Sequence, residues 1–110
     1  MVESTLRIIA ALKAVPPGRV SCYRDIARAA GLPNGARQVV RVLHSLARSQ
    51  DLPWHRIIRA DGYIALPPGE GRELQTALLR AEGVAADQAG RVDLEKYGWR
   101  GQKAEPGPDF

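Results

Sequence analysis

The chain has 110 residues, enough for one small domain with a single hydrophobic core but not for two. Its one cysteine, Cys22, excludes an internal disulfide bond and a zinc site built on paired cysteines. The net charge of +4 is unevenly distributed, because residues 19–59 hold eight arginines and only two acidic residues, a local charge of +6. Arginine suits phosphates and base edges, so this distribution favours a nucleic-acid partner, with a solvated basic surface as the alternative.

No apolar run approaches the length of a membrane span, and no signal peptide is visible at the start of the chain. We therefore expect a cytoplasmic protein without membrane contact, folded as one domain over residues 1–100. Residues 101–110 contain several prolines and glycines and are expected to form a disordered tail.

The first predicted helix covers residues 3–14. Its apolar side chains recur at the spacing of one helical face, which should contain Leu6, Ile8, Ile9, Leu12 and Val15. Two prolines and a glycine at residues 16–18 should end this helix, and residues 20–22 follow as a short extended segment. Two short helices are then predicted within residues 23–46, separated by a turn at Gly31–Gly35. A helix, a glycine-containing turn and a basic second helix are typical of a helix-turn-helix motif.

The second of these helices divides into two faces when its residues are placed at intervals of about 100°. Four cationic side chains fall within about 60° of one another, and they are Arg37, Arg41, His44 and Arg48. The roughly opposite side carries an aliphatic stripe of Val39, Leu43 and Leu46. This division is expected of a helix that lies against nucleic acid, although an ordinary exposed amphipathic helix has the same pattern.

The second half of the chain contains a strong hairpin signal. Residues 56–66, with the sequence RIIRADGYIAL, predict two strands joined by a turn at Asp61–Gly62. A loop leads into a predicted helix over residues 72–82, capped by Gly83. The inward face of this helix should consist of Leu74, Ala77, Leu78 and Ala81. Residues 91–99 are expected to add a short strand and aromatic packing.

The stretch LPWHRII, residues 52–58, has the composition of a reactive-site wall, but Trp54 at its centre is not a nucleophile and its N–H only donates. Cys22 could act as a thiolate, since the start of a helix lowers a thiol pKa, but a small residue at a capping position is the favoured interpretation. His55 and Glu82 could form a base and its orienting acid, with only water to activate. No metal-ligand spacing and no phosphate-binding loop is present. The residues alone therefore indicate no catalytic set, no metal site and no cofactor.

The same stretch resembles the PCHR active-site sequence of O6-alkylguanine-DNA alkyltransferases, with Trp54 where their acceptor cysteine stands. Three more segments are similar to that family: VPPGRVSCYRDIARAAG to its helix entry, GARQVVRVLHSL to its recognition helix and LLRAEG to its last core helix. The resemblance covers residues 3–99, and with the ending RVDLEKYGW it indicates the alkyltransferase-like proteins, in which tryptophan replaces the cysteine. It implies a mostly α fold with a small β-hairpin, a winged helix-turn-helix-like DNA-binding domain of the alkyltransferase C-terminal type.

The resemblance also implies roles for particular side chains. Arg37 matches the arginine that fills the gap left by a flipped nucleotide, which a planar guanidinium can do by stacking in the empty site. Tyr23 matches the tyrosine that contacts the phosphate beside the flipped base, and Glu82 matches the acid that helps polarise the cysteine in true transferases. The expected lesion pocket consists of Tyr23, Trp54, His55, Arg56, Pro67 and Glu82. The expected DNA-binding residues are Tyr23, Ala36, Arg37, Gln38, Arg41 and Arg48.

The implied function is that of a non-enzymatic sensor of DNA damage. It would bind O6-alkylguanine in double-stranded DNA through the minor groove, flip the base into a Trp-walled pocket, and as a monomer flag it for nucleotide excision repair proteins. Stacking of a base on the indole is worth about 1–3 kcal/mol, which offsets much of the energy of flipping. Two alternatives stay open: a residual alkyltransferase or hydrolase that uses Cys22 or His55, and a helix-turn-helix transcription regulator.

Three departures from the family pattern bear on these expectations. Val40 and Arg41 stand where the family usually has small residues, often two glycines, which leaves the depth of docking in the groove open. Cys22 replaces the usual serine or threonine before Tyr23, a weaker helix cap for which Ser21 should compensate. The loop ALPPGEGR lacks the pattern of the family's substrate loop, which leaves the preferred adduct size open.

Overall fold

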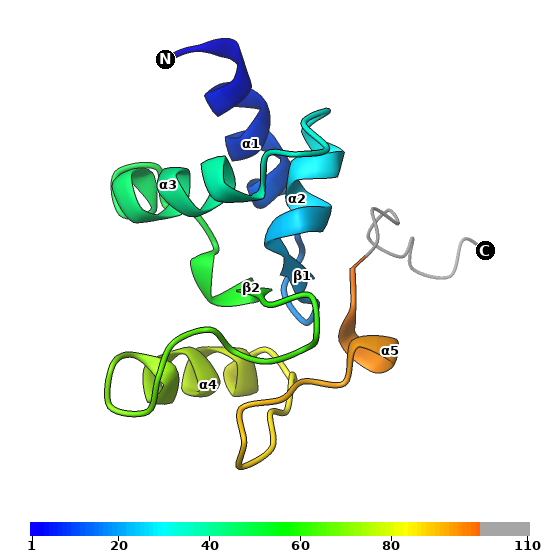
Figure 1. Ribbon diagram of the computed structural model, residues 1–110. Coiled ribbons are helices and arrows are strands. Elements are labelled where there is room, and N and C mark those ends of the chain that lie inside the picture. The colour runs from blue at the N-terminus through cyan, green and yellow to red at the C-terminus, as the bar shows by residue number, and fades with distance from the viewer. Residues whose placement is uncertain (100–110) are drawn as a thin grey trace, which may run out of the picture.

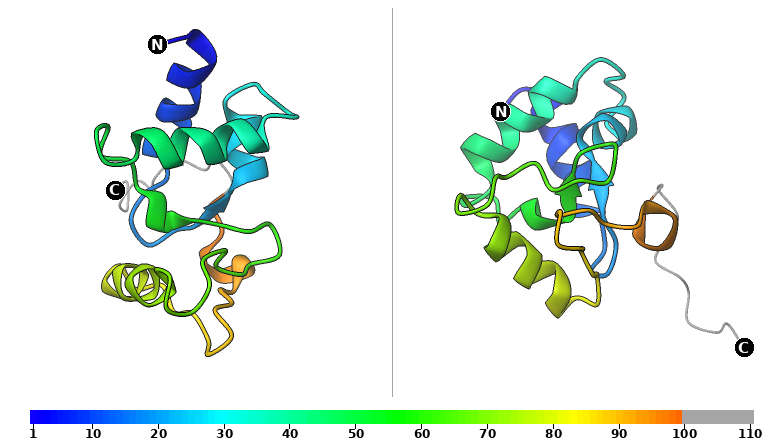
Figure 2. Two further views of the ribbon diagram at one scale, coloured as in Figure 1. Left: turned by 60° about the vertical axis from the view of Figure 1, so that its left-hand side comes forward. Right: turned by 60° about the horizontal axis from the view of Figure 1, so that its bottom comes forward.

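Residues 1–99 are described by the computed structural model, and the tail expected to be disordered, residues 101–110, lies outside the described residues. The elements follow the chain in the order α1 (Glu3–Lys13), β1 (Ser21–Cys22), α2 (Tyr23–Ala29), α3 (Ala36–Leu46), the 3-10 turn η1 (Trp54–Arg56), β2 (Ile57–Ile58), α4 (Arg72–Ala81) and α5 (Leu94–Tyr97). Helices α1, α2 and α3 form one end of the molecule and α4 lies at the other, with the two strands between them (Figures 1 and 2). Within the described chain, none of the helices has the length and apolar character needed to cross a membrane.

Helix α1 buries one face and leaves the other in solvent. Ile8, Leu12 and Val15 are completely buried and Ile9 is 7% exposed, so the predicted inward face is confirmed for these four residues. Leu6 is 51% exposed, and the prediction that it joins this face was wrong. At about 100° per residue, Leu6 points about 160° away from Ile8, on the far side of the helix.

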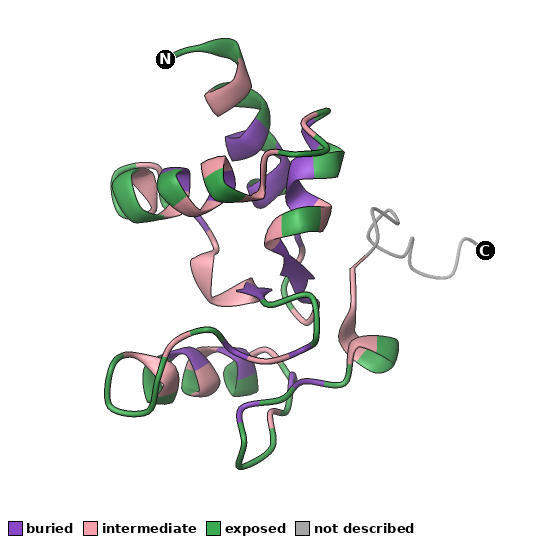
Figure 3. Cartoon of the chain, viewed as in Figure 1, coloured by how far each residue is buried: buried purple, intermediate pink, exposed green. Residues whose placement is uncertain are grey.

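Helices α2 and α3 form the predicted helix-turn-helix, and they pack with α1 around one apolar core (Figure 3). Gly31 follows α2 with a φ of +77°, a conformation that a residue with a side chain rarely adopts. The Leu32 amide then donates to the Ala27 carbonyl at 2.8 Å, which closes the turn. Just before α3, a side chain on Gly35 would meet the Leu32 Cβ at 2.9 Å. The short connection therefore depends on both glycines.

The small sheet lies between the two ends of the molecule, and its topology differs from the predicted hairpin. Strands β1 and β2 pair in parallel, with Ser21 opposite Ile57 and Cys22 opposite Ile58. All four residues are buried, including both isoleucines. A hairpin strand with one solvent face would leave alternate residues exposed, whereas strands buried on both faces are typical of parallel pairing. The β-hairpin prediction was therefore wrong, while the expected mostly helical fold with one small sheet is confirmed.

The turn at Asp61–Gly62 does form, but the segment after it pairs elsewhere. The Arg59 amide donates to the Tyr63 carbonyl at 2.9 Å across the turn. Beyond that point the Ile64 amide donates to the Gly90 carbonyl at 2.8 Å, so the chain pairs with a segment near its C-terminal end. The local turn signal was correct, and the pairing partner was set by the tertiary fold.

Helix α4 turns a different face inward from the one predicted. Its buried residues are Gln75 and Leu79, one helical turn apart, whereas Leu74 is 56% exposed, so the predicted inward face was wrong. The side-chain amide of Gln75 donates to backbone carbonyls beneath the helix, a contact that a count of apolar spacings does not reveal. The predicted cap is confirmed, because Gly83 has a φ of +87° and the Val84 amide donates to the Leu79 carbonyl at 2.9 Å in a Schellman motif.

The C-terminal segment completes a second apolar cluster, which contains Val20, Ile58, Ile64, Leu79, Val84 and Val92. The Val20 amide donates to the Tyr97 carbonyl at 2.9 Å, and the Trp99 amide donates to the Val20 carbonyl at 2.7 Å. The extended structure and aromatic packing expected at residues 91–99 thus take the form of a bridge beside β1, with Trp99 against the first core. The short helix α5, capped by the Asp93 side chain, was not expected.

Candidate nucleic-acid interface

The outer face of α3 and the turn that follows it carry a row of exposed basic side chains, here called the cation row after its three arginines. Its members are Arg37, Arg41, His44 and Arg48. Among residues 1–99, no carboxylate lies within ion-pair distance of these four side chains. The buried residues of the helix are Val39 and Val42, which belong to the first core. The predicted division into a cationic and an apolar face therefore exists, with Leu43 and Leu46 only half-buried at its edge.

The start of α3 presents Arg37 to solvent and ties the half-buried Gln38 to α1. Ala36, the first residue of the helix, is half-buried and small. Gln38 Nε2 donates to Ser4 Oγ at 2.8 Å, so this amide ties α3 to α1. No side chain caps the helix at Gly35, and the positive end of the helix dipole at this point favours a negatively charged group.

A pocket of about 330 Å³ opens beside this helix. Residues from α2, α3, η1, β2 and α4 contribute to its wall, which consists of Tyr23, Val40, Leu43, His44, Ala47, Trp54, Ile57, Leu66 and Gln75. The wall is mostly apolar, with an indole among its members, which suits a flat ring. Burial raises the pKa of the Tyr23 phenol, so this side chain keeps its proton at neutral pH and can donate a hydrogen bond.

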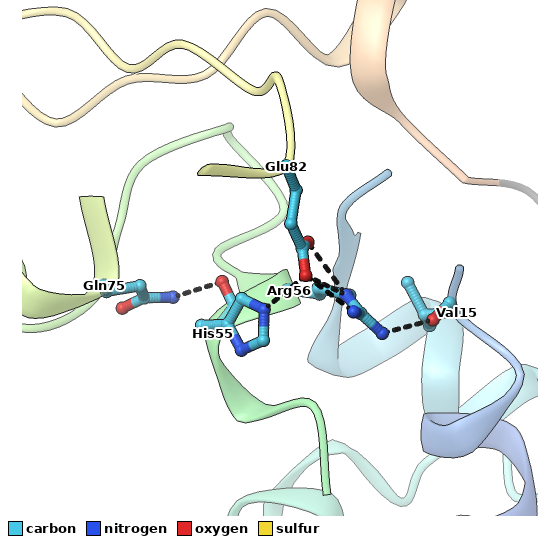
Figure 4. Close-up of polar contacts among 5 residues, drawn as sticks. All are labelled: Val15, His55, Arg56, Gln75 and Glu82. Carbon is cyan, nitrogen blue, oxygen red and sulfur yellow. Dashed lines mark hydrogen bonds and ion pairs between the residues drawn. The ribbon is translucent and has the colours of Figure 1, made fainter. Parts of the chain in front are cut away.

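The residues expected to form the lesion pocket fall into three groups. Tyr23 and Trp54 line the pocket. Pro67 is exposed and lies outside the wall, to which its neighbour Leu66 contributes instead. The others form a polar network next to the pocket (Figure 4), and they are His55, Arg56 and Glu82.

Much of the pocket wall was not predicted from the sequence. Four of its members lie along one flank of α3 and the residue after it, at about 240–340° from Arg37, and they are Val40, Leu43, His44 and Ala47. That spacing is visible in the sequence, where Leu43 was assigned to the core. Gln75 carries no such signal, because its place in the wall depends on the carbonyls of His55 and Ile57.

The polar network is built on a bidentate ion pair. Arg56 Nη2 lies 2.6 Å from Glu82 Oε2, and Arg56 Nε lies 2.9 Å from Glu82 Oε1. His55 Nε2 is 3.0 Å from Glu82 Oε2, and Arg56 Nη1 donates to the Val15 carbonyl at 3.0 Å (Figure 4). The hydrogen bonds from Arg56 are the main reason why the pKa of Glu82 is lowered to about 2. The network ties the ends of α1 and α4 to η1 and so fixes the backbone that carries Trp54.

The described part of the chain does not extend this network into a metal-binding cluster. Within residues 1–99, no group of three or more histidine, cysteine, aspartate or glutamate side chains is placed to hold a metal ion. His44 lines the pocket wall, whereas His55 is hydrogen-bonded to Glu82, so the two histidines do not form one site.

Cys22 borders a different cavity from Trp54. It lines a hollow of about 670 Å³ beside β1 and α2 and is not part of the Trp54 pocket. The thiol is 5% exposed, and burial raises its pKa, so the sulfur is protonated at neutral pH. Its neighbour Ser21 has a buried Oγ without a hydrogen-bond partner, so the expectation that Ser21 compensates as a helix cap was wrong.

Relatives of the chain were found by sequence. The family model described as 6-O-methylguanine DNA methyltransferase, DNA binding domain, matches residues 3–84. A DNA base-flipping protein of Escherichia coli K12 is 41% identical over 93 residues, which cover 84% of this chain and 71% of that protein. A protein of the same name from Vibrio parahaemolyticus is 38% identical over 102 residues, which cover 91% of this chain and 99% of that protein. Alkyltransferase-like protein 1 of Schizosaccharomyces pombe is 33% identical over 105 residues, which cover 91% of this chain and 97% of that protein.

Solved structures give the same result. The crystal structure of S. pombe Atl1 in complex with damaged DNA containing O6-carboxymethylguanine has a TM-score of 0.75 and 33% sequence identity, covering 90% of this chain and 96% of that chain. The crystal structure of Mycobacterium tuberculosis OGT in complex with DNA has a TM-score of 0.62 and 29% identity, covering 76% of this chain and 50% of that chain. The expected alkyltransferase type of DNA-binding fold is therefore confirmed. By sequence and by fold, the chain belongs to the 6-O-methylguanine-DNA methyltransferase DNA-binding family, among its alkyltransferase-like members.

Proposed function

We propose that this protein is a non-enzymatic sensor of DNA damage, which binds O6-alkylguanine in double-stranded DNA and flips the base into the pocket beside Trp54. One observation carries the proposal: the indole lines the pocket next to the cationic helix, whereas the thiol of Cys22 lines a different cavity. The names of the relatives, DNA base-flipping protein and alkyltransferase-like protein, support it. So does the S. pombe protein, whose crystal structure contains damaged DNA.

In the proposed complex, α3 lies in the minor groove with its cation row against the phosphates. Arg41 and Arg48 are exposed and hold no ion pair within residues 1–99, so binding to phosphate breaks no existing salt bridge. Arg37, at the start of the helix, stacks into the space that the flipped base leaves. The Tyr23 phenol donates to the phosphate beside it. Val40 lines the pocket, so its bulk narrows the pocket and leaves the cation row free.

The pocket holds the alkylated base without repairing it. Transfer of the alkyl group requires a thiolate in line with the alkyl carbon, and the indole N–H of Trp54 is only a donor. Cys22 cannot replace the missing acceptor, because it is buried, protonated and outside the pocket. Hydrolysis by His55 and Glu82 is disfavoured too, since Arg56 occupies both carboxylate oxygens.

A lesion that is held must be removed by other proteins, and nucleotide excision repair is the pathway that the family resemblance implies. An extruded base and a distorted duplex are features that such a system can recognise without reading the alkyl group itself. One monomer per lesion is enough, because a single chain carries both the pocket and the cation row. The check is whether the protein raises the rate of damage-dependent incision by purified excision-repair proteins.

The first experiment compares a duplex that contains one O6-methylguanine with its undamaged twin at fixed salt. Purified protein is titrated into both, and the DNA is then recovered and digested to measure the methylated base. Tighter binding to the lesion with the methyl group intact is expected. Equal binding would reduce the function to general DNA binding, and loss of the methyl group would revive the enzyme alternative. A footprint that follows sequence and ignores damage would favour a transcription regulator.

A further inference from the structure

The wall of the pocket contains a hydrogen-bond acceptor whose direction is fixed by the protein. Gln75 of α4 is 2% exposed and lines the pocket. Its Nε2 donates to the His55 carbonyl at 3.0 Å and to the Ile57 carbonyl at 3.2 Å. Carbonyl oxygens only accept hydrogen bonds, so the amino half of the amide must face them. The amide oxygen of Gln75 must therefore point the other way.

This oxygen has no donor within the described part of the chain, where both side-chain hydrogen bonds of Gln75 start from its nitrogen. The oxygen is not fully buried either, because among residues 1–99 only Ser21 Oγ is a fully buried side-chain polar atom without a hydrogen-bond partner. Figure 4 shows the Gln75 oxygen turned away from the His55 carbonyl. Gln75 is almost completely buried and lines the pocket, so the accessible part of its amide oxygen must face the pocket.

An acceptor can be satisfied only by a donor, and this requirement selects among alkylated bases. Alkylation of guanine at O6 removes the proton from N1, so O6 and N1 both lack a proton to donate. The 2-amino group is the donor that remains on the pairing edge. A thymine alkylated at O4 loses its N3 proton in the same way and has no donor left on that edge.

We propose that Gln75 is a specificity-determining residue of the pocket, whose amide oxygen accepts a hydrogen bond from the 2-amino group of a flipped O6-alkylguanine. The proposal rests on the proposed function, because it assumes that the flipped base enters this pocket. A ring without the 2-amino group leaves the acceptor buried and unpaired, which costs binding energy. The pocket then reads the purine through Gln75, independently of the size of the alkyl group.

The test uses two duplexes that differ only in this group: one carries O6-methylguanine and the other 6-methoxypurine, both opposite cytosine. Wild-type protein is compared with Gln75→Lys, since an ammonium can donate to the same two carbonyls but accepts nothing. Gln75→Met repeats the test without a charge. The matched control is Leu74→Gln, which changes the adjacent residue of α4, 56% exposed and outside the pocket wall. Thermal unfolding confirms that each variant is folded.

The quantity compared is the ratio of the two dissociation constants. Loss of the 2-amino group also weakens the base pair and makes flipping easier, but this effect is the same for every protein variant and cancels when their ratios are compared. Wild type and Leu74→Gln should favour O6-methylguanine by about tenfold more than either Gln75 variant does. A ratio that does not change on substitution of Gln75 would overturn the proposal and make Gln75 a structural anchor. If wild type does not distinguish O6-methylguanine from guanine at all, the proposed function fails and this inference fails with it.

Discussion

Arg56 and Glu82 form a bidentate ion pair in which Arg56 Nη2 lies 2.6 Å from Glu82 Oε2, and both side chains are largely buried, 15% and 17% exposed. The pair joins η1 to the end of α4, and a further hydrogen bond from Arg56 reaches the Val15 carbonyl just after α1. The resemblance to the transferases led us to expect Glu82 at the position of the acid that helps polarise their cysteine. Here its carboxylate is held by the guanidinium, so it acts mainly on the position of η1 and the stability of the fold.

This ion pair makes stability depend on pH in the acid range. The pKa of Glu82 falls from 4.5 to about 2 on folding, so the charged form stabilises the fold above about pH 4.5 and that contribution is lost as the pH falls towards 2. We expect about 1–3 kcal/mol of the free energy of unfolding to be lost over this window.

Urea unfolding at about pH 7 and about pH 3 measures the loss. Glu82→Gln should be less stable than wild type at neutral pH and should change less on acidification. The control is Glu70→Gln, at an exposed position. An unaltered pH dependence in Glu82→Gln would contradict this role.

The helix-turn-helix could be predicted from the sequence because its determinants are local. Gly31 and Gly83 end their helices in a backbone conformation with positive φ. Glycine favours this conformation because it lacks a side chain, so the signal depends on the residue itself and not on its tertiary contacts. The cation row of α3 could also be predicted, since residues at helical spacing share a face wherever the helix packs. Trp54 was found through the resemblance of its neighbours to a known motif, and the structure brings it together with Tyr23 in one wall.

The parts that could not be predicted depend on distant partners. The parallel pairing of Ile57 with Ser21 joins segments that no local signal connects, and the strong turn at Asp61–Gly62 pointed to the wrong partner strand. Gln75 is buried because it donates to two backbone carbonyls, one in η1 and one in β2, so a polar residue occupies the inward face of α4. Apolar spacing therefore placed Leu74 inside, although it is exposed.

Arg37→Ala should weaken binding to a lesion duplex far more than binding to undamaged duplex. A guanidinium that replaces the flipped base acts only when a base is flipped, and we expect a loss of about 1–3 kcal/mol on the lesion. The matched control is Arg48→Ala, at the other end of the same cation row, which should weaken both duplexes about equally through a lost phosphate contact. Fluorescence anisotropy at fixed salt measures both. Equal losses on the two duplexes for Arg37→Ala would exclude the base-replacement role.

Trp54→Ala should remove the surface on which the flipped base stacks. Lesion binding should weaken by about 1–3 kcal/mol, with little effect on undamaged duplex. Trp54→Phe keeps a smaller aromatic ring in the wall and should recover part of the affinity. Fluorescence of a 2-aminopurine placed beside the lesion reports whether the base is still extruded. Full lesion affinity in Trp54→Ala would mean that the indole only fills the pocket.

Cys22→Ser should leave lesion binding unchanged and should not alter the fate of the methyl group. The thiol is buried, its pKa is raised by burial, and it borders the cavity that excludes Trp54, so it has neither the charge nor the position to attack a base in the lesion pocket. Intact-protein mass spectrometry after incubation with O6-methylguanine duplex should show no added methyl group on the wild-type chain. A reagent that titrates thiolates should react slowly with the folded protein at about pH 8 and rapidly after denaturation, because unfolding removes the burial that raises the pKa. A methyl group found on Cys22 would require the base to enter the other cavity, and the pocket beside Trp54 would then lose its assigned role.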